Sequence, residues 1–351
     1  MASSERRSKH ILVIRLSAMG DVAMMVPVLK ALQDQHPHVN ITVLTKQHFH
    51  ALFSQLNNVK VNVADVKGKH KGPLGLWKLY KELRSLDIDA VADLHDVLRS
   101  NILVRYFRVG GVPFYQIDKG RKAKKKLTAA KNKVFKPLKT THERYADVFK
   151  RMGFPVDLSQ APLLEKEKLT NRILALVGRS SKKWLGIAPF AAHTGKMYPL
   201  DLMEKVIGDL NATSDCQILL FGGGEKEIGQ LDKLDGKFAN CLNIAGKLTF
   251  QEELALISNL DLMISMDSGN GHLAAMYGIP VITLWGVTHP YAGFYPFGQD
   301  INNALLADRE QFPLIPTSIY GNKMPLGYEL AIETIRPAEI IGKAQEILGS
   351  S

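Results

Sequence analysis

Residues 265–275 form the densest group that could bind an anion. A strand-like apolar run ends there, and a turn with two glycines leads into a helical pattern. The free amides and the positive dipole end at the start of such a helix suit a diphosphate. The turn contains Asp267, Ser268, Gly269 and His272. A lone histidine is more often structural than functional, but a turn of this composition favours contact between His272 and a ligand.

Two other loops carry residue types that bind nucleotides. In the loop 189–199, Thr194 offers a hydroxyl and Lys196 a compact positive charge, and both suit a phosphate. Three glycines at 222–224 let the backbone approach a ligand closely, and Glu225 just beyond could accept hydrogen bonds from ribose hydroxyls. The alternatives stay open: Lys196 could be a solvated surface lysine, and Glu225 could mark the acidic start of a helix.

The first loop after a strand, residues 15–22, contains one carboxylate, Asp21, and one glycine, Gly20. A dinucleotide fingerprint requires several glycines at fixed spacing, so the loop argues against a nicotinamide enzyme. Asp21 suits two roles. It could cap the helix that follows, or it could act in catalysis.

The elements that must position these loops alternate between strand and helix. Strands are expected at 11–16, 41–44, 61–64, 90–94 and 114–117, and again at 184–188, 217–221, 262–265 and 281–284. The clearest helical patterns are 23–35, 77–85, 202–210, 251–260 and 271–277. This alternation predicts an α/β protein with two doubly wound parallel sheets covered by helices.

The chain of 351 residues is longer than a single hydrophobic core usually supports, which favours two domains. Pro155 and Pro162 place the boundary within 153–167, so we expect domains at 1–160 and 161–351. The charged run that begins at Glu165 resembles the start of a helix. Ligands bind outside the carboxyl ends of parallel strands, so the loops of both domains should face a cleft. The amphipathic helix near 337–348 could pack on either domain.

Positive charge is concentrated in one segment. The net charge is +11, and residues 119–139 contain ten basic residues and no acidic one. This favours a specific anionic partner, although a solvated loop without a partner would have the same composition. Phe135 is the only aromatic residue in the segment, and no zinc-ligand spacing accompanies it, which argues against nucleic acid.

No apolar run reaches the roughly 18 to 20 residues that a membrane-spanning helix needs. The early run 11–16 is short and contains Arg15, so it predicts neither a span nor a signal peptide. Cys216 and Cys241 are too few for a disulfide framework and fit a reducing compartment. We therefore expect a cytoplasmic protein.

Together these motifs resemble glycosyltransferase family 9, whose best-known members are the heptosyltransferases of the lipopolysaccharide inner core. The resemblance rests on the Gly20-Asp21 turn, the lysine loop 196–199, the glycine turn before Glu225, the 267–272 turn and the 285–290 loop. These motifs span nearly the whole chain in the family's order and spacing.

The resemblance implies a GT-B fold of two Rossmann-like domains and an inverting transfer from ADP-heptose, with no cofactor and no obligatory metal. It implies that Asp21 is the general base and that Asp267 holds the donor sugar. The other donor contacts it implies are Lys196 and Thr194 at the diphosphate, Glu225 at the ribose, and Ser268, Gly269 and His272 around the phosphates.

The acceptor implied by the resemblance is lipid A carrying acidic sugars and phosphates, which would bring the enzyme to the inner face of the inner membrane. Candidate acceptor contacts are His95, Arg99, Arg121, Lys122, Lys124, Lys125 and Lys126. Two alternatives remain: a family 9 transferase that uses another sugar nucleotide, and a non-catalytic protein that binds sugar nucleotides.

Overall fold

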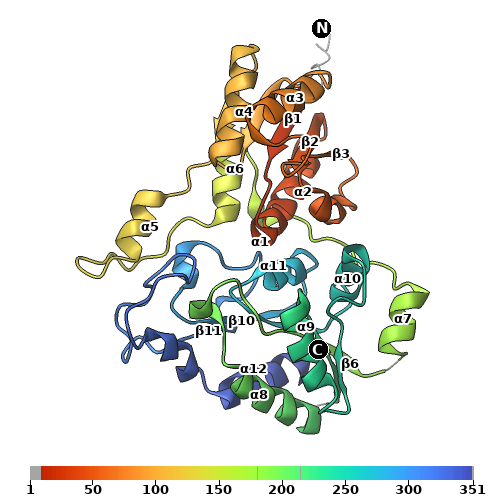
Figure 1. The fold of residues 1–351 in the computed structure, drawn as a ribbon, viewed down its shortest axis with the longest axis vertical. Coiled ribbons are helices and arrows are strands. Elements are labelled where there is room, and N and C mark those ends of the chain that lie inside the picture. The colour runs from red at the N-terminus through yellow and green to blue at the C-terminus, as the bar shows by residue number, and fades with distance from the viewer. Residues whose placement is uncertain (1–8, 180, 214, 350–351) are drawn as a thin grey trace. The chain divides into compact units, whose positions relative to one another are not determined.

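A computed structural model describes residues 9–179, 181–213 and 215–349. The chain forms two compact units that are not contiguous in sequence. Unit 1 contains Met1–Lys119 and Thr141–Leu163, and unit 2 contains Gly120–Thr140 and Leu164–Ser351. Each unit is a parallel sheet with helices packed against it (Figure 1).

Unit 1 is built on a five-stranded parallel sheet in the order β3-β2-β1-β4-β5. Its strands are β1 (Lys9–Ile14), β2 (Val39–Thr45), β3 (Val59–Val63), β4 (Ala90–Asp93) and β5 (Phe114–Gln116). Its helices are α1 (Met19–Ala23), α2 (Met25–Gln35), α3 (Gly72–Arg84), α4 (Leu98–Val109) and α6 (Thr141–Arg151), with the short 3-10 helices η1 (Gln47–Phe53) and η2 (Leu158–Gln160).

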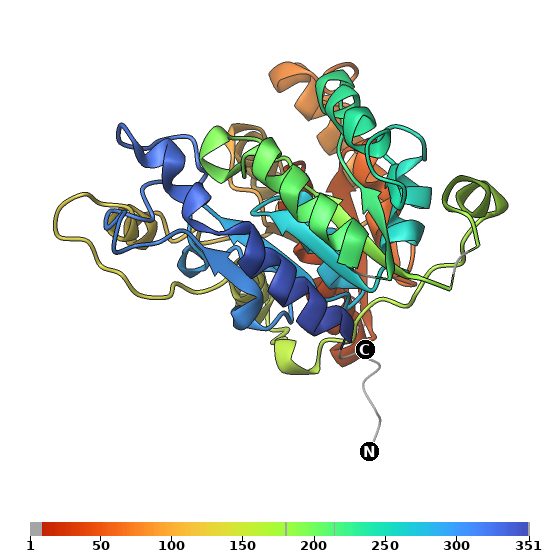
Figure 2. The ribbon, with the colours of Figure 1, turned by 90° about the horizontal axis from the view of Figure 1, so that it is seen from below.

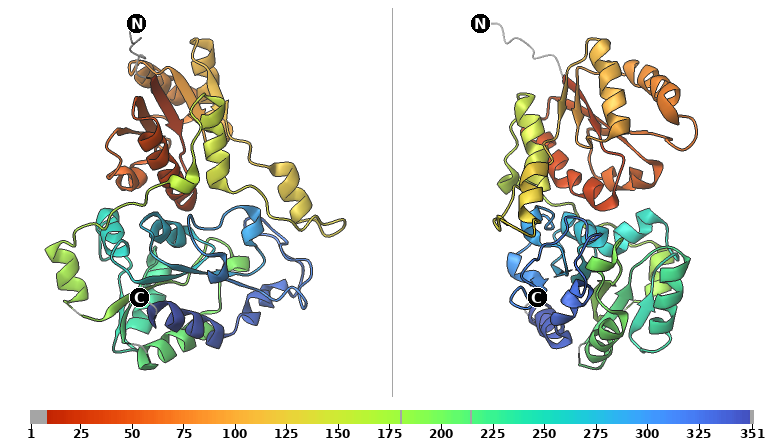
Figure 3. Two further views of the ribbon diagram at one scale, coloured as in Figure 1. Left: turned by 180° about the vertical axis from the view of Figure 1, so that it is seen from behind. Right: turned by 60° about the vertical axis from the view of Figure 1, so that its left-hand side comes forward.

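Helices cover both faces of this sheet (Figure 3). The four residues 11–14 of β1 are all buried, as expected for a parallel strand between two helical layers. On one face, Leu12 and Ile14 pack with apolar residues of α3 and α4, including Leu79 and Phe107. The continuous apolar run therefore places β1 at the centre of the unit, with its carboxyl end leading into the Asp21 loop.

Unit 2 is built on a six-stranded parallel sheet in the order β11-β10-β9-β6-β7-β8. Its strands are β6 (Lys183–Ala188), β7 (Cys216–Leu220), β8 (Cys241–Asn243), β9 (Leu262–Met266), β10 (Val281–Trp285) and β11 (Ala304–Leu306). Its helices are α5 (Arg121–Leu127), α7 (Asn171–Val177), α8 (Leu200–Thr213), α9 (Glu225–Asp235), α10 (Phe250–Ile257), α11 (Gly269–Met276) and α12 (Pro337–Gly349), with η3 (Thr194–Lys196), η4 (Pro290–Ala292), η5 (Ile301–Asn303) and η6 (Tyr328–Thr334).

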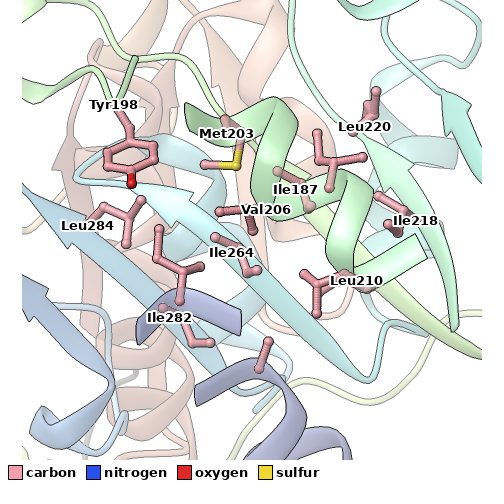
Figure 4. Close-up of a cluster of buried hydrophobic side chains, with 14 of the residues drawn as sticks. Ile187, Tyr198, Met203, Val206, Leu210, Ile218, Leu220, Ile264, Ile282 and Leu284 are labelled. Atoms are coloured by element: carbon pink, nitrogen blue, oxygen red, sulfur yellow. The ribbon is translucent and has the colours of Figure 1, made fainter. Parts of the chain in front are cut away.

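The core of unit 2 lies between the sheet and α8. Met203, Val206 and Leu210 recur at helical spacing and bury one face of α8 against strand residues such as Ile264 and Ile282 (Figure 4). The final helix, α12, packs beside α8 on the same face (Figure 2). The structure thus assigns the last helix to unit 2.

The strands expected from the sequence are all present, with ends shifted by a few residues. The helix expected at 23–35 begins earlier, because α1 starts at Met19 and is followed by α2 after Met24. The charged run after Glu165 does not begin a helix. Instead, Thr170 caps α7 by accepting a hydrogen bond from the amide of Ile173.

Each sheet has one point at which the strand order reverses. In unit 1 it lies between β1 and β4, and in unit 2 between β6 and β9. The loops after these strands contain Asp21 and His95 in unit 1, and Lys196 and Asp267 in unit 2. Open α/β sheets commonly bind ligands at this position, and four of the expected site residues lie in these loops.

The basic segment does not group as the sequence suggested. We expected it in the N-terminal domain, but residues 120–140 belong to unit 2. The cause is a set of contacts with residues far along the chain: Phe135 packs on Tyr291, and the amide of Leu138 donates to the carbonyl of Tyr291 at 2.9 Å. A sequence pattern cannot reveal such contacts.

Within the described ranges, none of the helices has both the length and the apolar character needed to cross a membrane.

Candidate functional site

The centre of the unit 2 site is an ion pair between Lys196 and Asp267. Nζ of Lys196 lies 2.7 Å from Oδ2 of Asp267 and donates to the main-chain oxygen of the same residue at 3.3 Å. The two side chains are 14% and 5% exposed. The pair therefore places a positive charge and a carboxylate, both largely shielded from water, at the switch point of the sheet.

Thr288, in the loop after β10, holds the same carboxylate. Its buried hydroxyl donates to Oδ2 of Asp267 at 2.9 Å. The ammonium group of Lys196 and this hydroxyl thus converge on one oxygen, and neither contact involves Oδ1. The sequence marked 285–290 as a polar loop but did not single out Thr288, because only the fold brings it to Asp267.

Close approach of backbones fixes the lysine loop. A Cβ atom at Gly195 would lie 2.6 Å from the carbonyl oxygen of Gly321, and one at Gly321 would lie 2.6 Å from Cγ of Lys196. The amide of Val287 donates to the carbonyl of Gly195 at 2.9 Å. Gly321 also has a φ of 76°, which favours glycine. The stem of Lys196 therefore rests directly on a loop that follows β11.

The turn that we expected to bind an anion leads into the start of α11. Ser268 is the N-cap residue, and its hydroxyl lies 3.0 Å from that of Ser265, which accepts from the amide of Gly271 at 3.2 Å. Gly269 is the first helical residue, and His272 is buried in the first turn. The first amides of a helix have no partner within it and favour an anion, so this turn is chemically suited to a phosphate.

The remaining donor candidates are exposed. Thr194 opens the short helix η3, and Glu225 is the first residue of α9 after Gly224. A different acid, Glu227, fixes the glycine turn, because its Oε2 accepts from the amide of Gly223 at 2.8 Å. The sequence analysis did not identify Glu227. The exposure of Thr194 and Glu225 leaves both side chains accessible to a nucleotide.

In unit 1, Asp21 is held by a buried arginine. Nη2 of Arg15 forms an ion pair with Oδ2 of Asp21, and Nη1 donates to the carbonyl of Leu94 at 2.6 Å. The same Oδ2 accepts from the amide of Ala18 at 3.3 Å, so Asp21 also caps α1. The hydroxyl of Tyr145 donates to the main-chain oxygen of Asp21 at 3.1 Å. The Asp21 side chain is still 26% exposed, so it caps the helix and remains accessible from solvent.

Charges around this loop shift the pKa values of its neighbours. Burial lowers the pKa of the Arg15 guanidinium, but Tyr145 and Asp21 outweigh that effect and raise it. Burial, with the charges of Arg15 and Lys119, lowers the pKa of His95 to about 3. His95 is therefore neutral at pH 7, and its Nδ1 accepts weakly from the amide of Leu16 at 3.4 Å.

The acceptor candidates lie in both units. His95 is buried in the loop after β4, and Arg99 is exposed in the first turn of α4. The other five, Arg121, Lys122, Lys124, Lys125 and Lys126, are on α5 of unit 2. In the described part of the chain, no group of three or more His, Cys, Asp or Glu side chains is arranged to hold a metal ion.

Two doubly wound units, each with polar side chains in the loops at the switch point of its sheet, are the architecture of GT-B glycosyltransferases. Residues 76–314 match the model of glycosyltransferase family 9 (heptosyltransferase), which is more than half of the chain. The chain belongs to this family.

Curated relatives are similar over most of the chain. The lipopolysaccharide core heptosyltransferase OpsX of Haemophilus influenzae is 25% identical over 293 residues, which are 80% of this chain and 80% of that protein. Lipopolysaccharide heptosyltransferase 3 of Escherichia coli is 28% identical over 283 residues, or 77% of this chain and 80% of that protein.

Solved structures show the same fold. A family 9 glycosyltransferase from Veillonella parvula superposes with a TM-score of 0.75 at 19% identity, with full coverage of both chains. The ADP-heptose lps heptosyltransferase II of Escherichia coli has a TM-score of 0.69 at 18% identity and covers 97% of this chain and 99% of that one. At these identities the likeness establishes the GT-B architecture.

Proposed function

We propose that this glycosyltransferase moves a heptose from ADP-heptose, with inversion, onto an anionic, lipid-linked acceptor of the lipopolysaccharide inner core. The observation that carries the proposal is the cluster of Lys196, Asp267 and Thr288 beside the start of α11. It combines a cation for a diphosphate with a carboxylate that can accept hydrogen bonds from sugar hydroxyls.

In this proposal the donor site stabilises the leaving group. When the glycosidic bond to the diphosphate breaks, negative charge develops on the departing oxygen. Lys196 and the first amides of α11 supply fixed positive charge for it, with Ser268, Gly269 and His272 around the phosphates. Thr194 would add a hydroxyl contact to the diphosphate, and Glu225 would accept from the ribose.

Asp21 would act on the acceptor. Inversion in a single displacement needs one base to take the proton from the attacking hydroxyl. Asp21 is partly exposed, and its position is fixed by Arg15 and by the amide of Ala18. A carboxylate with fixed geometry and an open side suits this role. His95, Arg99 and the α5 cations are the candidate contacts to the acidic groups of the acceptor.

The names of the relatives support heptose as the transferred sugar and lipopolysaccharide as the acceptor. The two curated relatives are named heptosyltransferases of lipopolysaccharide, and one similar solved structure is described as an Escherichia coli heptosyltransferase with ADP. Transfer of those specificities to this chain is part of the proposal.

The first test is calorimetric titration of the whole protein with ADP, UDP, GDP and NAD. A preference for ADP supports an ADP-linked donor. Tighter binding of UDP or GDP would replace the donor and favour a family 9 transferase for another sugar nucleotide. Selective binding of NAD would contradict the proposal. Turnover of ADP-heptose with an inner-core acceptor, followed by NMR of the product anomer, then tests the sugar and the inversion.

A further inference from the structure

The basic segment 120–140 is anchored to unit 2 by its less polar side. The ring of Phe135 contacts the guanidinium of Arg309, which lies 3.5 Å from the ring centroid, and the rings of Tyr291 and His289, at centroid distances of 4.8 and 5.0 Å. Leu127 is fully buried. These contacts order a segment that its composition alone would leave as a solvated loop.

Lys133 ties the segment to a second loop of the same unit. Its Nζ donates to the carbonyls of Leu127 and Pro316, each at 2.8 Å. Burial, with the nearby charge of Arg309, lowers the pKa of Lys133. Figures 2 and 3 show the segment, in yellow, running beside the blue loops that follow β11. One cation of the segment is thus structural and joins 120–140 to the loop 315–327.

The other side of the segment is cationic and open to solvent. Residues 120–140 contain no acidic residue, so the segment itself offers no neutralising carboxylate. Its exposed lysines include Lys122, Lys125, Lys126, Lys131 and Lys136. They lie on both sides of the Lys133 anchor, so the charge extends along the whole docked segment.

The joined loop adds exposed apolar side chains. Leu326 is 99% exposed and Tyr320 is 59% exposed. Residues 315–327 contain one charged residue, Lys323, and it is also basic. Val134, next to the Lys133 anchor, is exposed as well. A surface therefore combines exposed lysines with protruding leucine and tyrosine side chains on two segments that are bonded to each other.

We infer that this surface, residues 120–140 with 315–327, binds the face of an anionic phospholipid bilayer. Lysines near such a face are attracted by its negative potential, and leucine and tyrosine side chains partition into the headgroup region. The inference rests on the proposed function, because the proposed acceptor is linked to a membrane lipid. The surface itself contains none of the residues proposed to bind the donor.

Nucleic acid is a poorer match. Single strands are bound by cations together with exposed aromatic rings on which bases stack. Phe135, the one aromatic residue of 120–140, packs against Arg309, Tyr291 and His289, which leaves Tyr320 as the one exposed ring of the surface. An exposed leucine such as Leu326 adds nothing to the stacking of bases, whereas at a lipid interface its side chain can insert among the headgroups.

Vesicle co-sedimentation of the full chain tests the inference. Vesicles contain phosphatidylglycerol mixed with phosphatidylcholine, or phosphatidylcholine alone, and no glycolipid. We expect binding to the anionic vesicles only, weakened by salt. Lys131→Glu with Lys136→Glu should reduce it about tenfold or more. Leu326→Ser should reduce it by a few-fold. The matched control reverses two exposed lysines elsewhere on unit 2, Lys205→Glu with Lys233→Glu, and should bind like the unmodified protein.

Three results would overturn the inference: no binding to anionic vesicles, equal loss in the control, or tighter binding to single-stranded DNA than to vesicles. Calorimetry with ADP separates this surface from the proposed reaction. If ADP fails to bind while vesicle binding follows the pattern above, the proposed donor is wrong and the membrane surface stands. If ADP binds and vesicles do not, the reverse holds.

Discussion

The ammonium group of Lys196 lies 2.7 Å from Oδ2 of Asp267, and the pair joins the loops after β6 and β9 across the switch point of unit 2. The same contact holds the lysine that we propose binds a diphosphate and neutralises a buried carboxylate. Binding and stability are therefore linked at this pair, and substitutions can separate them.

Removal of the lysine should weaken nucleotide binding. A hydrogen bond to a charged group contributes about 1.5–3 kcal/mol, so Lys196→Ala should lower the affinity for ADP by roughly 10- to 100-fold in calorimetry. It should also lower the melting temperature, because Asp267 loses its buried counter-charge. Lys205→Ala, an exposed lysine on α8, is the control and should change neither value.

A double variant separates the two effects. Adding Asp267→Asn to Lys196→Ala removes the unpaired charge, so the melting temperature should recover while the affinity for ADP stays low. Recovery of both would show that Lys196 acts only through the stability of the fold.

Thr288 should affect the sugar more than the diphosphate. Its hydroxyl holds one carboxylate oxygen of Asp267, the residue proposed to bind the donor sugar. Thr288→Val should weaken ADP-heptose binding by about tenfold, the value of one hydrogen bond, and leave ADP binding within about twofold. Thr288→Ser, which keeps the hydroxyl, should restore most of the loss.

A buried threonine on β10 provides the control for that prediction. Thr283 accepts from Nε1 of Trp285 at 2.8 Å and is equally buried. Thr283→Val should reduce stability without changing the ratio of the two affinities. An equal change of that ratio in both variants would contradict a specific role for Thr288.

Asp21→Asn should separate catalysis from binding. A positioned base contributes about 10²- to 10⁴-fold in rate, so kcat should fall by that factor with ADP affinity unchanged. Asp34→Asn, an exposed carboxylate on α2, should retain full turnover. If the unmodified protein binds ADP-heptose but does not turn it over, the chain is a sugar-nucleotide-binding protein and not an enzyme.

Stability should fall in acid because of two buried histidines. Burial lowers the pKa of His289 to about 4, and that of His95 to about 3, from about 6.5 in the unfolded chain. The unfolded state therefore binds more protons between about pH 4 and 6.5, and the free energy of unfolding rises with pH across this window. Urea unfolding at about pH 4.5 and 7 should show this slope.

The histidine responsible can be identified by substitution. Nδ1 of His289 accepts from the amide of Tyr291 at 3.1 Å, a bond that requires an unprotonated nitrogen. His289→Gln should reduce the slope by about half, because His95 still contributes to it. His50→Gln, at an exposed position of η1, should leave the slope as it is in the unmodified protein. An unchanged slope in His289→Gln would assign the effect to other groups.

The sequence was a good guide wherever structure depends on local pattern. Buried β-branched runs marked the principal strands, and the turns after β6 and β9 marked Lys196 and Asp267. The strands β8 (Cys241–Asn243) and β11 (Ala304–Leu306) were missed, because three residues carry too little periodicity. Roles for Asp21, Glu225 and the other donor contacts remain predictions.

What the sequence could not supply is pairing across long separations. Thr288 reaches Asp267 only through the neighbouring positions of β9 and β10. Gly321 is far from Lys196 in sequence, yet it lies under the lysine stem. Phe135 looked like an isolated aromatic residue in a basic run, and its partners His289 and Tyr291 lie in the loop after β10.

The chain passes between the units at three places: after Lys119, after Thr140 and after Leu163. A fragment that begins at Leu164 would therefore lack a piece of its own unit and expose the ring faces of His289 and Tyr291. The same limit applies to recombination between two related genes. A crossover at Leu164 would join residues 120–140 of one parent to the His289 and Tyr291 surface of the other. A domain exchange that keeps unit 2 whole must therefore carry residues 120–140 together with 164–351.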